Sequence, residues 1–314
     1  MNIKTINAPW FASLVPALAG YAMAAICVRG FEFYGWSLFL GVPMAVCFLS
    51  AFCTSFRREV PFRAAYWTSM ASLVLVCGLT LLSGLDGLIC LIMAFPLAMI
   101  LGLVGACFGR ALGSACGGRA RAALPAVLVL MFPLVVGFDR ATRPPVPMRT
   151  VTTLVFIQSP IDRVWQTVIA FPRIKEPLRG LFRLGIAYPI EARIDGVGVG
   201  AVRHCVFSTG SFVEPITAWR EPTLLAFDVS SSPPPMEEIS FYEHLDAPHL
   251  HGFMHSHRGQ FQLAQDGDQV LLEGTTWFTH SLSPQWYWGP ISDYIIHRIH
   301  ERVLHHIKHI SESR

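Results

Sequence analysis

Three charged residues lie within stretches that otherwise alternate like apolar β-strands: Arg203, Glu214 and Glu273. A charge at such a position either points to water or lines an internal cavity. If Arg203 met a glutamate in a cavity, the pair would orient the polar end of a ligand or shift a carboxyl pKa for acid–base chemistry. The alternative is that these charges face solvent or form a structural ion pair. All three are therefore candidate catalytic residues.

The twelve histidines all lie after residue 203, and two His-x-His pairs fall within nine residues: His249, His251, His255 and His257. On an extended backbone both rings of a pair point to one side, as zinc or copper requires. Glu243 or Asp246 would add an oxygen ligand. The stretch has weak periodicity, however, which is more typical of a loop with exposed histidines. We therefore expect no metal or other cofactor.

Two further histidines, His297 and His300, lie one turn apart on the predicted final helix. Near the mouth of a cavity, either would serve as a ligand contact or a general base. The surrounding residues lack the His-Glu-x-x-His order of zinc proteases. The alternative is that both belong to a solvated polar face of the helix.

The chain that must position these residues changes character near residue 140. Residues 1–138 contain no histidine and three acidic residues, and the whole chain has a mean hydropathy of +0.46. About 20 apolar residues in a helix cross a bilayer. The sequence predicts five such spans in a transmembrane region 1–139, at about 10–28, 33–52, 66–83, 88–108 and 122–138. An alternative for the first span is a cleavable signal segment.

Basic residues near the spans predict the orientation. Seven lysines and arginines lie on the side of the N-terminus and four on the other side. This imbalance favours an inner N-terminus and an outer C-terminal half, which in a bacterial cell membrane is the periplasmic side. Gly105, Gly109 and Gly113 recur every four residues, a spacing that permits close helix packing. A proline-rich linker, 140–149, follows the spans and holds the next domain near the membrane surface.

Residues 150–314 are predicted to form a second domain with alternating strands and a terminal helix. Ser159-Pro160 predicts a helix start, with Ser159 as the cap. A second short helix is expected over 172–182. Strands are expected at about 150–157, 190–194, 200–207, 211–219, 224–229, 258–264 and 270–280, and the last helix at 284–311.

Specific strings accompany this order: Ile157-Gln-Ser-Pro-Ile-Asp-Arg-Val-Trp165, Gly210-Ser-Phe-Val-Glu-Pro-Ile-Thr-Ala-Trp219 and Leu272-Glu-Gly-Thr-Thr-Trp-Phe278. With them, residues 150–312 resemble the START-like (SRPBCC) superfamily of polyketide cyclase/dehydrase and lipid-transport type. The resemblance implies an α+β helix-grip domain, in which a curved antiparallel sheet wraps a long C-terminal helix around a cavity. The candidate ligand-binding residues are the aromatic ones, which alternatively are plain core: Phe207, Phe212, Trp219, Phe227, Phe241, Trp277 and Tyr294.

Several function classes find no support in the sequence. It has no phosphate-binding loop of the Gly-x-x-x-x-Gly-Lys type and no Gly-x-Ser-x-Gly nucleophile motif. Residues 139–314 carry 16 Lys+Arg against 18 Asp+Glu, so a nucleic-acid partner is not expected. We expect a membrane-anchored protein that binds a hydrophobic small molecule or lipid. The alternatives are a cyclase or dehydratase with acid–base residues in the cavity, and a structural or assembly module whose protein partner the sequence does not identify.

Overall fold

The computed structural model describes residues 10–56, 59–115, 119–242, 245 and 247–313, with the backbone alone for 119–122. The chain forms two compact units. The first comprises Met1–Pro144 together with Glu238–Pro248, and the second comprises Pro145–Glu237 together with His249–Arg314. The chain therefore passes from one unit to the other three times.

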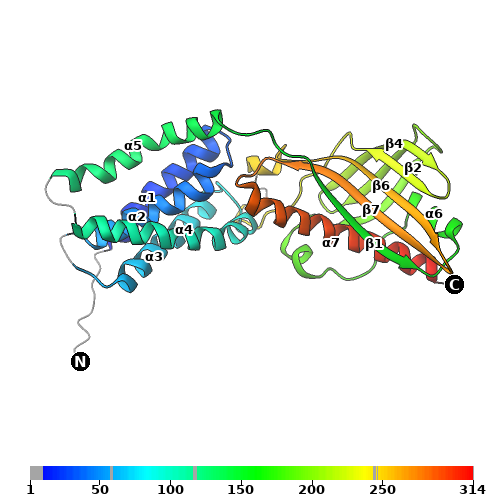
Figure 1. The fold of residues 1–314 in the computed structure, drawn as a ribbon, viewed down its shortest axis with the longest axis horizontal. Coiled ribbons are helices and arrows are strands. Elements are labelled where there is room, and N and C mark those ends of the chain that lie inside the picture. Colours follow the sequence, from blue (N-terminus) through cyan, green and yellow to red (C-terminus); the bar gives the residue numbers. More distant parts are fainter. Residues whose placement is uncertain (1–9, 57–58, 116–118, 243–244, 246, 314) are drawn as a thin grey trace, which may run out of the picture. The chain divides into compact units, whose positions relative to one another are not determined.

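The first unit is helical (Figure 1). Its elements are α1 (Phe11–Ala25), the π-helical turns η1 (Ile26–Gly30) and η2 (Ser37–Gly41), then α2 (Val42–Thr54), α3 (Phe62–Leu82), α4 (Leu88–Ala115) and α5 (Arg119–Ala141). In the described part of the chain, five helical segments are long and apolar enough to cross a membrane, judged by length and composition. They are Phe11–Gly30, Ser37–Thr54, Phe62–Leu82, Leu88–Ala115 and Ala123–Ala141.

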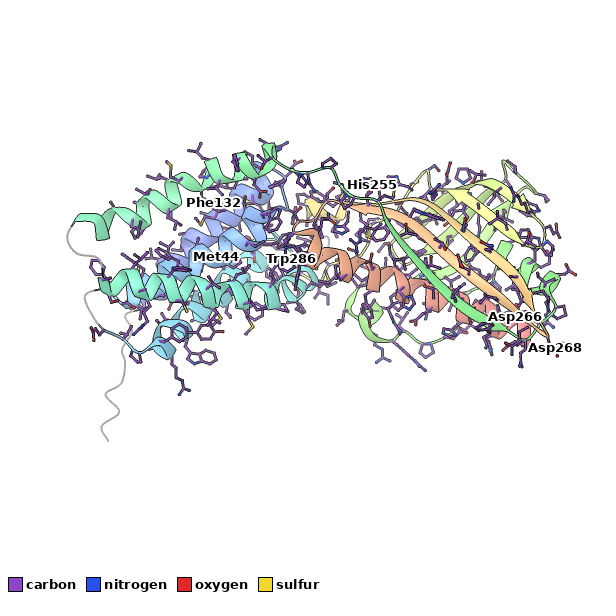
Figure 2. All side chains as sticks on the ribbon, in the orientation of Figure 1. Met44, Phe132, His255, Asp266, Asp268 and Trp286 are labelled. Carbon is purple, nitrogen blue, oxygen red and sulfur yellow. The ribbon has the colours of Figure 1, made fainter. Side chains whose placement is uncertain are left out.

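Glycines of α4 pack against the backbone of α2. A Cβ on Gly105 would lie 2.4 Å from the carbonyl oxygen of Met44, which Figure 2 labels, and one on Gly109 would lie 2.2 Å from that of Phe48. Real Cβ atoms do not come so close to a backbone, so glycine is required at both positions. The packing role expected from the glycine spacing is confirmed.

A short segment that comes much later in the chain completes the first unit. Carboxylate oxygens of Glu238 accept hydrogen bonds from the backbone N–H groups of Ile89 (2.9 Å) and Cys90 (3.1 Å). The next carbonyl, that of Ile239, accepts one from Leu88 N–H at 2.9 Å. These donors belong to the first turn of α4, whose N–H groups have no partner within the helix. Glu238 therefore caps α4, although 148 positions separate it from Cys90.

The second unit is built on one seven-stranded antiparallel sheet, with strand order β1-β7-β6-β5-β4-β3-β2. The strands are β1 (Arg149–Ile157), β2 (Pro189–Asp195), β3 (Val202–Phe207), β4 (Gly210–Arg220), β5 (Leu224–Asp228), β6 (Met254–Asp266) and β7 (Gln269–His280). Asp266 and Asp268 flank the glycine of the β6–β7 turn (Figure 2). Gly267 has φ of +58° there, as a tight hairpin turn requires.

Two helices cover the inner face of this sheet: α6 (Ile161–Ile169) and the long α7 (Gln285–Glu312), which runs beside β1 and β7 (Figure 1). The core between them includes Trp165, Leu272 and Leu304, all fully buried. A curled antiparallel sheet that holds a long C-terminal helix is the helix-grip architecture. For this unit the expected fold class is confirmed.

Two local predictions are wrong. Residues 172–179 form no helix, and the short 3₁₀ turn η3 occupies Gly180–Leu184. The backbone of this segment bonds to β2 instead: Ile174 N–H donates to the Ile190 carbonyl at 2.7 Å. Ser159 does not cap α6, because Pro160 is the N-cap residue and the Ser159 hydroxyl donates to the Ser311 carbonyl at 2.8 Å.

Candidate functional site: a cavity between the sheet and α7

A cavity of about 130 Å³ lies between α7 and the inner face of the sheet. Residues of β3 to β7, of α7 and of the loop Ser232–Pro235 line it. Phe207, Phe212 and Phe227 supply aromatic walls, and the rings of the first two lie 4.8 Å apart with tilted planes. Ile299 of α7 contributes aliphatic surface. Three of the predicted aromatic ligand contacts therefore line one cavity.

Arg203 and Glu214 meet in the wall of this cavity. They are directly opposite in the register of β3 and β4, and Arg203 Nη1 forms an ion pair with Glu214 Oε2. Their exposed fractions are 1% and 6%. Arg203 Nε also donates to the Ile169 carbonyl at 3.2 Å. A charge this deeply buried is tolerated because it is paired and hydrogen-bonded.

One nitrogen of Arg203 is left without a partner. Nη2 is buried and makes no hydrogen bond to any described residue. The guanidinium carbon lies 5.4 Å from the ring centre of Phe261 and 5.7 Å from that of Phe227, so aromatic faces surround the charge.

Burial shifts the acid–base properties of the groups around Arg203. It raises the pKa of Glu214, although the neighbouring guanidinium opposes the change. It also raises the pKa of Cys205, which follows Arg203 on the same face of β3, to about 12. The thiol is therefore protonated at neutral pH and is a poor nucleophile.

His300 lines the same cavity from α7, and both of its ring nitrogens contact hydroxyl groups. Nδ1 lies 3.1 Å from Thr153 Oγ1, and Nε2 lies 2.8 Å from Thr276 Oγ1. Burial and then the nearby His297 lower the pKa of His300 to about 4. His300 is accordingly neutral at physiological pH.

Other predicted residues of this unit lie away from the cavity lining. Glu273 lies on the opposite face of β7 from the buried Leu272 and accepts a hydrogen bond from the Thr275 hydroxyl at 3.1 Å. Trp277 lies under the Arg258 guanidinium at 4.4 Å. Trp219 packs edge-on against Trp165.

The remaining aromatic candidates are exposed. Tyr294 is 56% exposed on α7, and Phe241 belongs to the first unit, with 73% of its surface exposed. Neither is among the residues that line the cavity.

The four loop histidines differ in their surroundings. His249 is buried in the 3₁₀ turn η4 (Pro248–Leu250), whereas His251, His255 and His257 are exposed. The rings of His255 and His257 lie 6.5 Å apart, and His257 Nε2 contacts Thr279 Oγ1 at 2.9 Å. Glu243 and Asp246 lie outside the described residues.

The proline loop Ser232–Pro235 and the α7 residue Ile299 were not among the predicted site residues. The three consecutive prolines indicate a stiff loop in the sequence. The part of the sheet that this loop covers depends on its contact with the β3–β4 turn, which the sequence does not show. There Thr209 Oγ1 donates to the Pro234 carbonyl at 2.7 Å. A Cβ on Gly210 would lie 3.1 Å from Pro233.

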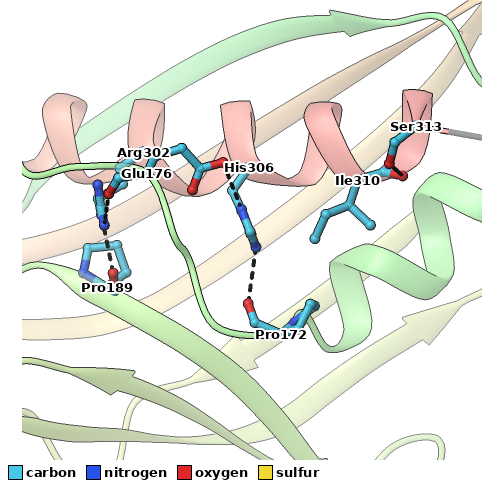
Figure 3. A network of polar contacts seen from close by, with 7 residues as sticks. All are labelled: Pro172, Glu176, Pro189, Arg302, His306, Ile310 and Ser313. Atoms are coloured by element: carbon cyan, nitrogen blue, oxygen red, sulfur yellow. Dashed lines mark hydrogen bonds and ion pairs between the residues drawn. The ribbon is translucent and has the colours of Figure 1, made fainter.

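Polar contacts hold the segment before β2 against α7 (Figure 3). His306 Nδ1 lies 3.2 Å from Glu176 Oε1, and its Nε2 lies 3.0 Å from the Pro172 carbonyl oxygen. Both partners are acceptors, so only a doubly protonated ring can donate to both. Burial raises the pKa of Glu176, but hydrogen bonds from its own backbone and from His306 outweigh this and lower it. Arg302 adds a bond to the Glu176 carbonyl at 3.1 Å.

No family model and no curated protein matches the chain. Solved structures match about half of it. A protein from Nitrosospira multiformis is 15% identical over 52% of this chain and 97% of its own, with a TM-score of 0.34. Zhui aromatase/cyclase from Streptomyces is 16% identical over 53% and 94%, with a TM-score of 0.33. Norcoclaurine synthase from Thalictrum flavum is 9% identical over 54% and 91%, with a TM-score of 0.34. At such low identities and TM-scores, none of them bears on the ligand or the reaction of this chain.

Proposed function

We propose that this protein binds a hydrophobic small molecule or lipid in the cavity between the sheet and α7. The observation that carries the proposal is an unfilled, largely apolar cavity that contains one buried guanidinium. Arg203 Nη2 has no partner among the described residues and lies among aromatic rings. Such a site favours an apolar body with one oxygen acceptor, such as a carbonyl, a hydroxyl or a carboxylate.

We further propose that the first unit anchors the protein in a cell membrane, with the second unit on the outer, periplasmic side of a bacterial cell. The support is the length and apolar composition of the five helical segments and the excess of basic residues on the N-terminal side. Alkaline phosphatase fused after Arg314 should be active, because this enzyme requires the periplasm. A fluorescent cytoplasmic reporter in its place should then be dark. The reverse pattern would invert the topology and leave the cavity proposal intact.

Extraction of bound molecules tests the cavity. The full chain, purified in detergent, should carry a defined apolar compound detectable by mass spectrometry. Ile299→Trp fills the cavity from α7 and should abolish co-purification. His305→Trp adds the same ring at an exposed position of the same helix and should not. Equal contents in all three proteins would contradict binding in the cavity.

An enzyme is the second candidate, because Glu214 and His300 line the cavity with shifted pKa values. Perturbed titratable groups that face a ligand site are typical of acid–base catalysis. In a cyclase or dehydratase reaction, these two groups would exchange protons with a bound carbonyl compound. The compound that co-purifies with His300→Gln is compared with the compound from the wild type. If the two differ by a proton-dependent rearrangement, an enzyme is favoured over a carrier.

A further inference from the structure

A line of hydrogen-bonding groups runs from the cavity to the surface of the second unit. It begins at Thr276, which lines the cavity, and its hydroxyl lies 2.8 Å from His300 Nε2. His300 Nδ1 lies 3.1 Å from Thr153 Oγ1, which lies 2.8 Å from His297 Nδ1. His297 Nε2 lies 3.4 Å from Glu301 Oε1. Five side chains from β1, β7 and α7 thus connect end to end.

The outer end fixes the direction of these bonds. A carboxylate only accepts. In the tautomer that carries the His297 proton on Nε2, this N–H faces Glu301 Oε1 at 3.4 Å, and Nδ1 accepts from the Thr153 hydroxyl. The Thr153 oxygen then accepts from the Nδ1–H of His300.

The same reasoning continues to the cavity. A neutral His300 with its proton on Nδ1 offers the Nε2 lone pair to the Thr276 hydroxyl. His300 and Thr153 each give one hydrogen bond and receive one, and His297 receives one and presents its Nε2–H to Glu301. All the bonds point from the cavity toward Glu301.

The two ends differ in their access to water. Thr276 and His300 line an apolar cavity, whereas the side chains of His297 and Glu301 are 43% and 28% exposed. Arg298 also forms an ion pair with Glu301. The line therefore joins a cavity wall to solvent.

We propose that Thr276, His300, Thr153, His297 and Glu301 form a proton relay that serves a cavity ligand bearing an acidic hydroxyl, such as a phenol or an enol. This inference rests on the proposed binding of a ligand in the cavity. The ligand O–H bond breaks, its electron pair stays on the ligand oxygen, and its proton passes to the Thr276 oxygen. The proton of Thr276 moves to His300 Nε2, and that of His300 Nδ1 moves to the Thr153 oxygen.

The remaining steps carry the proton to Glu301. The Thr153 proton moves to His297 Nδ1, and the His297 Nε2 proton forms a new O–H bond on Glu301, which releases it to solvent. One proton leaves the ligand and one reaches Glu301, with no change of oxidation state. Arg203, in the same cavity, supplies positive charge for the ligand oxyanion.

Thr153 is the residue that tests the relay, because it joins the two histidines and its exchange for valine removes the hydroxyl with little change in shape. The matched control is the preceding residue of β1, Thr152, whose hydroxyl contacts Thr275 Oγ1 at 3.0 Å on the other face of the sheet. Thr152→Val removes the same group from the same strand without touching the relay.

The experiment is nitrogen NMR of the full chain with ¹⁵N-labelled histidine, assigned with His297→Gln and His300→Gln. In the wild type, His300 should be the Nδ1–H tautomer and His297 the Nε2–H tautomer. In Thr153→Val, exchange of the His300 ring proton with water should become slower, whereas mere loosening of the structure would make it faster. Thr152→Val should leave it unchanged. An Nε2–H tautomer of His300 in the wild type, or exchange that is unchanged or faster in Thr153→Val, would overturn the relay.

The ligand class is tested separately with 4-nitrophenol and 4-nitrotoluene, which differ by the hydroxyl. The phenol should shift the His300 Nε2 signal, and nitrotoluene should bind without doing so. Equal shifts would contradict the preference for a hydroxyl. If neither compound binds, the cavity proposal fails, while the tautomers and exchange rates still decide the relay.

Discussion

Arg203 and Glu214 are paired across β3 and β4, so that a complete ion pair is enclosed in the wall of an apolar cavity. The register of the two strands sets the pair: a tight turn at 208–209 joins β3 and β4, so the two residues lie opposite each other. The charge of Arg203 is therefore fixed in place before any ligand arrives. Such preorganisation lowers the entropic loss on binding.

Removing one partner of this ion pair should destabilise the second unit more than removing both partners. Arg203→Met leaves Glu214 buried without a cation and should lower the free energy of unfolding by about 3–5 kcal/mol. The double variant with Glu214→Leu should lose clearly less, because no uncompensated charge remains. Denaturant unfolding followed by circular dichroism measures both. A double variant as unstable as the single one would show that packing, rather than charge, sets the loss.

His300 should make the fold sensitive to acid. The unfolded chain binds a proton on this ring below its ordinary pKa of 6.5, whereas the folded chain binds it below about 4. As pH falls through that window, the proton favours the unfolded chain, and stability drops by up to about 3 kcal/mol. His300→Gln should flatten this part of the curve of melting temperature against pH. His305→Gln, at an exposed position of the same helix, should leave the curve as it is.

Gly109 should tolerate no side chain. Gly109→Ala places a Cβ against the Phe48 carbonyl, forces α4 away from α2 and should destabilise the first unit by about 1–3 kcal/mol. Gly78→Ala on α3 meets nothing within 4 Å and is the control. Melting in detergent compares the two. Equal melting temperatures would mean that α4 and α2 do not depend on this contact.

Removal of the Glu238 carboxylate should loosen the start of α4. Glu238→Ala leaves the Ile89 and Cys90 N–H groups without their partner and should weaken this turn by about 1 kcal/mol. Hydrogen exchange of a peptide covering these residues should become faster. Glu237→Ala, one residue earlier and exposed, should not change it. Unaltered exchange in both variants would remove the capping role.

The sequence predicted the strands and the final helix, because strand alternation and turn signals are local. It left open whether Arg203 faces solvent or a cavity. It could not predict which face of α7 meets β1, so His297 and His300 were named without their link through Thr153. The segment 172–182 resembled a helix, yet its backbone found partners on β2, and long-range pairing decides such cases. Likewise, nothing in the composition around Glu238 indicates a helix end 148 positions earlier.

The placement of Glu238–Pro248 in the first unit has a consequence for biosynthesis. The ribosome makes α1 to α5 first, but the residue that caps α4 emerges only after β1 to β5 have been synthesised. The helical unit must therefore wait, incompletely folded, while much of the sheet is translated. Its last piece arrives from within the domain that follows it, so the helical unit is complete only after that piece has been made.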